Sequence, residues 1–323
     1  PAERPQQPDQ PTTPTTDEGQ EIQQPISDNV DDVSLDNKGN ARFYNEDDGK
    51  FYELNVEGKL KQLSDKTFFN VDKVAWSPKD DKAIMEYPDG SNIYYDFQTK
   101  QQETLPKHWE EFGFSPQNRW LIKSNPDGSS VEKIVNLGNN EDKVDVDWSP
   151  NEQVVGTSKT GEARGAYRQE VLLLGEQNQN FNSISVPGRG LQSKWSPSGE
   201  KLLYSVYSGR NNFKPELWIV NGDPGNIGQN RRKLNVDTWA EKCNFKNEKY
   251  VYCGVPTELR EGAGFEPSIA NNIEDNIYKI NTETGAKTQI ETKLDFTVDS
   301  LHIRENKLII KGKNKSGLYE IEL

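Results

Sequence analysis

Residues 194–207, KWSPSGEKLLYSVY, contain the tripeptide Trp195-Ser196-Pro197, followed by a polar turn and an apolar run. The same element recurs along the chain, once with phenylalanine in place of tryptophan, at Trp76-Ser77-Pro78, Phe114-Ser115-Pro116 and Trp148-Ser149-Pro150. Proline ends a strand without having to donate a ladder hydrogen bond, and the small polar residues beside it favour a tight turn. The element therefore predicts a strand, a turn and a second strand.

Further apolar segments complete each unit. A third strand is predicted at FYELNV, NIYYDF, VEKIVNL, EVLLLG, ELWIVN, NIYKIN and GLYEIEL, and three units add a fourth segment at KLKQLS, QQETLP or KTQIET. Four short strands per unit is the pattern of a propeller blade. Three degraded units complete the count at seven: SLDNKGNARFYN, KCNFKNEKYVYCG and SLHIRENKLIIKG. The resulting spacing, about 42 residues per unit, is typical of blades.

The two ends of the chain are predicted to meet. The chain stops at Leu323, directly after the third strand of its last unit. We expect Gln20–Ile26 to supply the missing fourth strand, because this closes the ring and leaves no open sheet edge. The fold class predicted for residues 20–323 is thus all-β, a seven-bladed propeller of four-stranded antiparallel blades. Residues 1–19, rich in proline and threonine, are predicted to be a disordered tether with little apolar surface to bury.

The Trp-Ser-Pro element resembles the WD-like propeller repeat of the TolB family, and similar repeats occur in prolyl-oligopeptidase-like and tricorn-type propellers. The resemblance covers nearly everything after the tether and implies the fold. It implies little about function, because propellers host binding modules and enzymes alike. The N-terminal α/β domain of TolB-like proteins and the hydrolase domain of the peptidases have no counterpart here.

The charge of the chain disfavours some partners. Lys plus Arg number 39 against 52 Asp plus Glu, a net charge of −13. Phosphate backbones and anionic lipid surfaces would be repelled, so nucleic acid is not an expected partner. No stretch approaches the about 20 apolar residues of a membrane helix. A tether of this composition often leads to a removed signal or anchor, so a membrane link is expected only through such a lost segment.

The chain has two cysteines, Cys243 and Cys253. The repeat alignment puts Cys243 in the place of Trp195 and Cys253 in the place of Ser205, around a turn centred near Glu248. The cysteines then face each other on antiparallel strands, at a spacing compatible with a disulfide. Two free thiols are the alternative; zinc is disfavoured because no further ligands stand nearby. A disulfide indicates an oxidising, extracytoplasmic compartment, whether periplasmic, cell-surface or secreted.

Candidate catalytic groups are few. A hydrolase triad needs a histidine base, and the two histidines, His108 and His302, read as structural or surface residues. The acidic pairs Asp31-Asp32, Asp47-Asp48 and Asp80-Asp81 stand at turns and match no calcium loop, although 36–40 faintly resembles one. We therefore predict no metal, no cofactor and no enzyme activity. A carboxylate pair for glycan cleavage would come from different blades and leaves no linear motif.

Loop length varies from blade to blade. Blades four to six have long connections between their second and third strands, at SKTGEARGAYRQ, SGRNNFKPE and GVPTELREGAGFEPSIANNIED, whereas early blades have turns such as PDGS. These connections emerge on one face of a propeller, which is where repeat folds place function. They carry arginines and aromatic residues, the types enriched at binding surfaces: Arg164, Tyr167, Arg168, Arg210, Phe213, Arg260 and Phe265. Alternatively, the loops only cap the propeller, with both phenylalanines buried and the arginines paired to acids.

These observations favour a monomeric, non-enzymatic binding or scaffold module outside the cytoplasm. Its expected partner is a protein or a cell-envelope component, bound through the face that carries the long loops. One alternative is a glycan-processing hydrolase or lyase with carboxylates around the central channel. Another is a structural subunit of an envelope complex.

Overall fold

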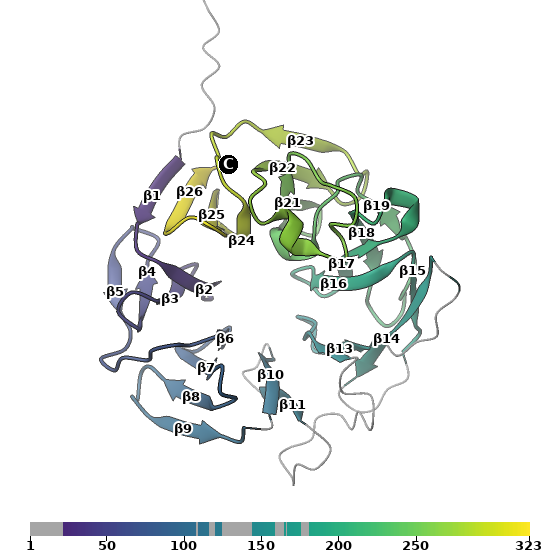
Figure 1. Ribbon diagram of the computed structural model, residues 1–323. Coiled ribbons are helices and arrows are strands. Elements are labelled where there is room, and N and C mark those ends of the chain that lie inside the picture. The colour runs from purple at the N-terminus through teal and green to yellow at the C-terminus, as the bar shows by residue number, and fades with distance from the viewer. Residues whose placement is uncertain are drawn as a thin grey trace, which may run out of the picture.

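The computed structural model describes residues 22–107, 109–115, 120–124, 144–158, 165, 167–175 and 181–323. Within these residues the chain forms seven antiparallel sheets around a central axis, six of them four-stranded and one two-stranded (Figure 1). This confirms the predicted seven-bladed propeller. The tether at 1–19 and the third-blade segment VEKIVNL lie outside the described residues.

The strands of each blade follow the chain from the axis outward. Blade 1 has β2 (Val30–Leu35), β3 (Ala41–Asn45), β4 (Lys50–Leu54) and β5 (Leu60–Gln62); blade 2 has β6 (Lys73–Trp76), β7 (Lys82–Glu86), β8 (Asn92–Asp96) and β9 (Gln102–Leu105). Blade 3 has β10 (Trp109–Phe114) and β11 (Trp120–Ser124). Blade 4 has β12 (Val144–Val146), β13 (Val154–Ser158), β14 (Gln169–Gly175) and β15 (Ile184–Val186).

The later blades are built in the same way. Blade 5 has β16 (Arg189–Trp195), β17 (Lys201–Tyr207), β18 (Pro215–Asn221) and β19 (Arg232–Lys233); blade 6 has β20 (Cys243–Asn247), β21 (Tyr250–Pro256), β22 (Asp275–Asn281) and β23 (Lys287–Ile290). Blade 7 has β24 (Val298–Arg304), β25 (Lys307–Gly312), β26 (Leu318–Glu322) and β1 (Ile22–Ile26). In the described part of the chain, short 3-10 turns lie in connections at η2 (Gly209–Asn211), η3 (Ala240–Lys242) and η4 (Pro267–Ala270).

The ring closes through the N-terminal strand, as predicted. β1 pairs with β26, with Ile22 opposite Ile321 and Ile26 opposite Leu318. Gly317 permits this approach, because a Cβ there would lie 2.2 Å from the carbonyl oxygen of Ile26. The last blade is therefore completed by residues from the opposite end of the chain, which covers the edge that β26 would otherwise expose.

The serine of the Trp-Ser-Pro element completes the hairpin that follows it. Ser196 is fully buried, its N–H donates to the Lys201 carbonyl (2.9 Å), and its hydroxyl accepts the Lys201 N–H (3.0 Å). Ser149 and Val154 make the same reciprocal pair at 2.8 and 2.9 Å. The hydroxyl thus takes the place of a backbone acceptor at the point where the strand pairing ends.

In blades 2 and 5 the tryptophan of the element ties the blade to the one before it. The Trp195 indole N–H donates to the Asp147 carbonyl (3.2 Å), and that of Trp76 donates to the Asp32 carbonyl (2.7 Å). Trp148 and Trp195 are buried, whereas Trp76 and Phe114 are half-buried. The predicted interblade anchors are therefore in place, with two of the four less covered than the others.

Cys243 and Cys253 form a disulfide and stand directly opposite each other, as predicted. Both are fully buried. Cys253 takes the place of Ser205, but the placing of Cys243 at the Trp195 position is wrong: Ser205 pairs with Gln192, so Cys243 takes the place of Gln192. The reason is the length of the turn between the first two strands. In blade 6 only Glu248 and Lys249 lie between the last paired residues, whereas in blade 5 the turn runs from Ser196 to Lys201.

Truncation of an interblade anchor should destabilise the fold. Trp195→Ala removes a buried indole and its hydrogen bond to the neighbouring blade, and we expect a loss of about 3–5 kcal/mol in the free energy of unfolding, measured by urea titration. Phe69→Ala is the control, since Phe69 is 62% exposed and should change stability by less than about 0.5 kcal/mol. A loss below about 1 kcal/mol for Trp195→Ala would show that it is not an anchor.

Loss of the disulfide should also destabilise the chain. The bridge spans a sequence separation of 10, for which loop-closure entropy gives about 2–3 kcal/mol. The double variant Cys243→Ser/Cys253→Ser should lose about that much stability in urea titration. Thiol titration of the denatured, unreduced protein should find no free thiol, and two free thiols would refute the pairing.

Candidate functional site

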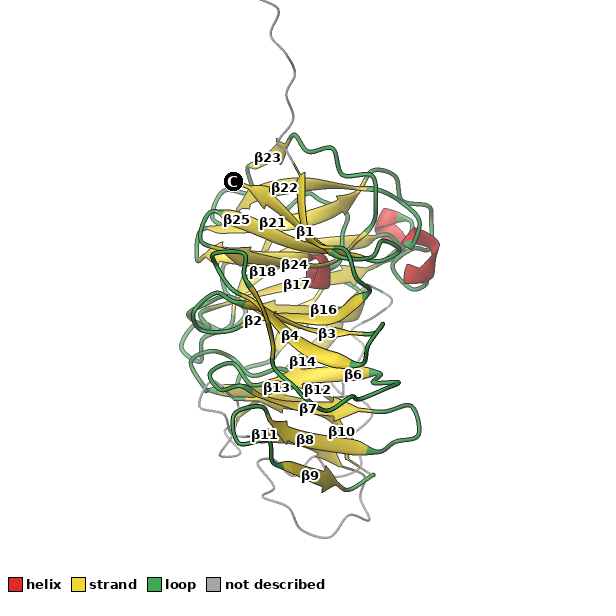
Figure 2. Cartoon of the chain, turned by 90° about the vertical axis from the view of Figure 1, so that its left-hand side faces the viewer, coloured by secondary structure: helices red, strands yellow, loops and turns green. Residues whose placement is uncertain are grey.

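The long connections of blades 4, 5 and 6 meet on one side of the ring. Figure 2 shows helical turns projecting from the strands at the right of the side view. The connections of blades 5 and 6 are joined by backbone hydrogen bonds: Gly262 N–H donates to the Asn212 carbonyl (2.9 Å) and Gly264 N–H to the Phe213 carbonyl (2.7 Å). The predicted side-by-side placement of these loops is thus observed for their described parts.

Aromatic rings from the three connections form one group, here called the aromatic cluster and consisting of Tyr167, Phe213 and Phe265. Phe213 and Phe265 meet edge to face, with ring centroids 5.7 Å apart. Gly209 lies between Tyr167 and Phe213, since a Cβ on it would be 3.3 Å and 3.4 Å from their rings. The cluster therefore joins one residue from each of three consecutive blades.

The members of the aromatic cluster are exposed to solvent. Tyr167 is 42% exposed, Phe213 40% and Phe265 59%. The alternative in which Phe213 and Phe265 are buried beneath the loops is therefore wrong. The apolar residues under the blade-6 loop are instead Trp239, Leu259, Ala263, Ala270 and Ile273. This small core supports the loop from below and leaves Phe265 outside.

The backbone under the cluster is strained. Asn212 and Phe213 have φ values of 51° and 55°, a region that bulky residues rarely adopt. Such strain persists where the surroundings determine the conformation, and it concentrates at functional sites. Here the Gly264 N–H bond to the Phe213 carbonyl holds the strained residue, whose ring meets Phe265.

Arginines surround part of the cluster. The Arg210 guanidinium lies 5.0 Å from the centroid of the Tyr167 ring, within cation–π range. Arg168 and Arg260 are exposed, and within the described part of the chain none of these three arginines forms an ion pair. Arg260 and Arg168 have no ring contact there, so the structure brings together Tyr167, Arg210, Phe213 and Phe265 out of the predicted set. Arg164 lies outside the described residues.

A charged network joins the last and first blades. The Lys311 ammonium lies 2.7 Å from an Asp31 carboxylate oxygen and 2.9 Å from one of Asp299. Carboxylates from both blades thus share one cation, which joins blade 7 to blade 1. The cavity beside Asp299, also lined by Glu241 and Lys242, has a volume of about 20 Å³, space for about one water molecule and far too little for a sugar ring.

Burial shifts the pKa values of two titratable groups on the first strands of blades 7 and 5. Burial lowers the pKa of His302 to about 3 and that of Lys194 to about 8. A neutral imidazole with so low a pKa is a poor general base at neutral pH, which agrees with the structural reading of His302. His108 lies outside the described residues.

In the segment 36–40, which faintly resembles a calcium loop, the Asp36 carboxylate accepts hydrogen bonds from the segment itself. The Asp36 carboxylate accepts the N–H groups of Lys38 and Asn40, each at 2.8 Å, and the Asn40 side-chain amide at 2.9 Å. These bonds are those of an Asx turn. The described residues contain no group of three or more His, Cys, Asp or Glu side chains placed to hold a metal ion, and none of their helices is long and apolar enough to cross a membrane.

No family model and no curated protein matches the chain. Solved structures do: the β-propeller domain of Cps50 (Swd1) from Myceliophteria thermophila (TM-score 0.58, 11% identity, covering 94% of this chain and 99% of that one), and an oligogalacturonate lyase in complex with manganese (0.55, 12%, 94% and 98%). The tricorn protease has TM-score 0.54 and 11% identity over 95% of this chain, which spans only 34% of that protein.

At these identities the likenesses show the fold alone. The chain is a β-propeller, and the similar structures include enzymes as well as other propellers, so they do not decide between binding and catalysis. They also do not single out the TolB family among propellers.

The pH dependence of stability tests the channel electrostatics. Burial, followed by the charge of Asp31, raises the pKa of Asp32 from 3.8 to about 7. The native state therefore binds the proton more tightly than the unfolded state, and this carboxyl lowers stability as pH rises from about 4 through about 7. Asp32→Asn, which tolerates the φ of 49° there, should raise the free energy of unfolding by about 1–3 kcal/mol at pH 8 and much less at pH 4. Equal effects at both pH values would contradict the buried neutral acid.

Proposed function

We propose that this chain is a non-enzymatic binding propeller that works outside the cytoplasm and contacts a protein or cell-envelope partner through its aromatic cluster. The proposal rests on the grouping of Tyr167, Phe213 and Phe265, which come from three blades. Each of these residues is 40–59% exposed. Contiguous exposed aromatic groups are uncommon on surfaces that bind nothing, and they concentrate binding energy at interfaces.

The arginines favour an acidic partner. Arg168, Arg210 and Arg260 form no ion pair within the described residues, so their positive charge is available on a chain whose net charge is −13. Such a local field orients an oppositely charged partner during encounter. Arg210 also stacks on Tyr167, which places charge directly beside apolar contact area.

Two observations support the location and the lack of catalysis. The buried Cys243–Cys253 disulfide suits an oxidising compartment outside the cytoplasm. The carboxylates of Asp31 and Asp299 share the ammonium of Lys311, which favours a structural role for this pair over acid–base work on a glycan.

Replacement of the cluster should abolish binding without loss of stability. We expect the triple variant Tyr167→Ser/Phe213→Asn/Phe265→Ser to reduce capture of envelope proteins by at least about tenfold, equivalent to about 1.4 kcal/mol. Asn is chosen at 213 because it tolerates a positive φ. Quantitative pull-down from the native envelope fraction and a thermal melt are the two measurements.

The matched control is Phe69→Ser/Leu172→Ser, which removes exposed apolar side chains elsewhere; Phe69 is 62% and Leu172 37% exposed. Capture by this control should equal that of the parent chain. Unchanged capture by the triple variant, or equal loss in both variants, would refute the proposed binding face.

A further inference from the structure

A polar groove runs along the outer seam between blades 5 and 6, where β18 and β19 face β22 and β23. Two cavities lie in this seam, with volumes of about 570 Å³ and 620 Å³, each within the usual range of ligand pockets. They adjoin each other, because consecutive residues of β19 line them: Arg232 the first and Lys233 the second.

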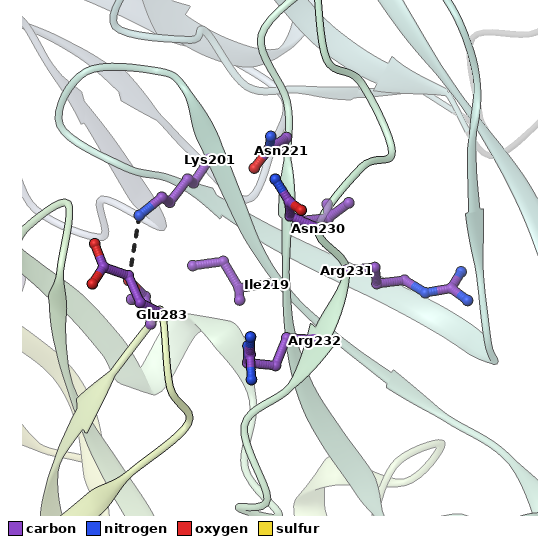
Figure 3. Close-up of a pocket in the computed structure, with 9 residues that line it drawn as sticks. Lys201, Ile219, Asn221, Asn230, Arg231, Arg232 and Glu283 are labelled. Atoms are coloured by element: carbon purple, nitrogen blue, oxygen red, sulfur yellow. Dashed lines mark hydrogen bonds between the residues drawn. The ribbon is translucent and has the colours of Figure 1, made fainter.

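Polar side chains surround the first cavity (Figure 3). Lys201 and Glu283 stand on one side, the amides of Asn221 and Asn230 on another, and Arg232 below, around Ile219. The Arg231 guanidinium points away from this group and donates to the Ser185 carbonyl of blade 4. β19 thus directs Arg232 into the seam and its neighbour Arg231 out of it.

The second cavity is lined in a similar way. Its wall includes Asn211, Lys214, Asp237, Glu258 and Lys287, together with the half-buried ring of Tyr278. The Asn211 amide donates to the Asp237 carboxylate (3.1 Å), which fixes the orientation of both groups. An aromatic ring among amides and carboxylates is suited to a ligand with an apolar face and many hydroxyl groups.

The cations of the seam are not neutralised by acids. Lys201, Arg232 and Lys287 donate to carbonyls of the facing blade, at Glu248 (2.8 Å), Thr284 (3.4 Å) and Asn235 (2.8 Å). Among the described residues these three and Lys214 form no ion pair. Lys233, in contrast, is paired with Glu216. Because lysine and arginine have three and five donors, the seam cations keep free N–H groups for a ligand.

The acids of the seam are equally unpaired. Glu283, Asp237 and Glu258 lie beyond ion-pair distance of any cation in the described part of the chain. Carboxylates and side-chain amides accept hydrogen bonds from hydroxyl groups, while the cations bind carboxylates. The groove thus combines partners for hydroxyl groups with partners for negative charge.

We propose that this seam binds an acidic oligosaccharide, a chain of uronate residues whose carboxylates contact Arg232 and Lys214 and whose hydroxyl groups contact the asparagines and acids. A folded protein or acidic peptide is a poorer fit, because protein interfaces depend on aromatic anchors in apolar pockets, and the walls of both cavities are mainly polar. The site shares no residue with the aromatic cluster, although Asn211 and Lys214 lie in the same connection as Phe213, and it does not depend on the function proposed for the cluster.

Direct binding of defined sugars tests the proposal. The probes are short β-1,4-linked oligomers of glucuronate and mannuronate. Cellotetraose is the uncharged control for tetraglucuronate, and hexaglutamate is the acidic peptide control. Calorimetry and ligand-observed NMR measure binding to the full chain. We expect a uronate oligomer to bind at least about tenfold more tightly than cellotetraose or hexaglutamate, the gain from one charge-assisted contact.

The protein variants are matched in charge and position. Lys214→Ala/Arg232→Ala should weaken uronate binding by about tenfold or more. The control Arg189→Ala/Lys246→Ala, which removes two cations of blades 5 and 6 that line neither cavity, should leave binding unchanged within about twofold. Hydrogen exchange verifies that both variants are folded. No binding of either uronate, equal binding of cellotetraose or hexaglutamate, or equal weakening by both variants would overturn the proposal.

Discussion

The pairing of β1 with β26 is the constraint on which the remaining structure depends. Each blade buries its two faces only against its two neighbours, so an open ring would expose a face of blade 1 and a face of blade 7 together with a free strand edge. Completing the last blade with residues from the start of the chain removes that weakness. Lys311 reinforces the same junction, since its ammonium binds carboxylates from both blades.

Elsewhere in the ring, the Trp-Ser-Pro element helps to join neighbouring blades. In blade 5 its serine ends the hairpin with a buried hydroxyl and its tryptophan donates to the preceding blade, so one tripeptide organises both the fold of the blade and its contact with its neighbour. Blade 6 lacks the element and instead has a shorter turn and a disulfide inside the core. The disulfide there links the first two strands of the blade covalently.

The blades of the ring are alike, so the surfaces that differ in chemistry lie in the connections and in the seams between blades. The extended connections of blades 4 to 6 lie on one side, where hydrogen bonds between loops and a small apolar core hold Phe213 and Phe265 outward. The seam between blades 5 and 6 has a different chemistry, with amides and unpaired charges around the half-buried ring of Tyr278. The two surfaces that we propose for binding, one shared by blades 4 to 6 and one between blades 5 and 6, thus differ in their chemistry.

The fold was predictable from the sequence because it is repetitive and local: the Trp-Ser-Pro spacing, the apolar strands and the missing last strand follow from hairpin pairing within about 42 residues at a time. The cysteine pair was predictable for the same reason. Only the tertiary structure decided that Cys243 takes the place of Gln192, that Arg210 rather than Arg260 meets an aromatic ring, and that Arg232 and Lys214 share a seam. These contacts join residues of different blades and loops, and their geometry depends on turn lengths, strand facing and blade packing that no linear motif records.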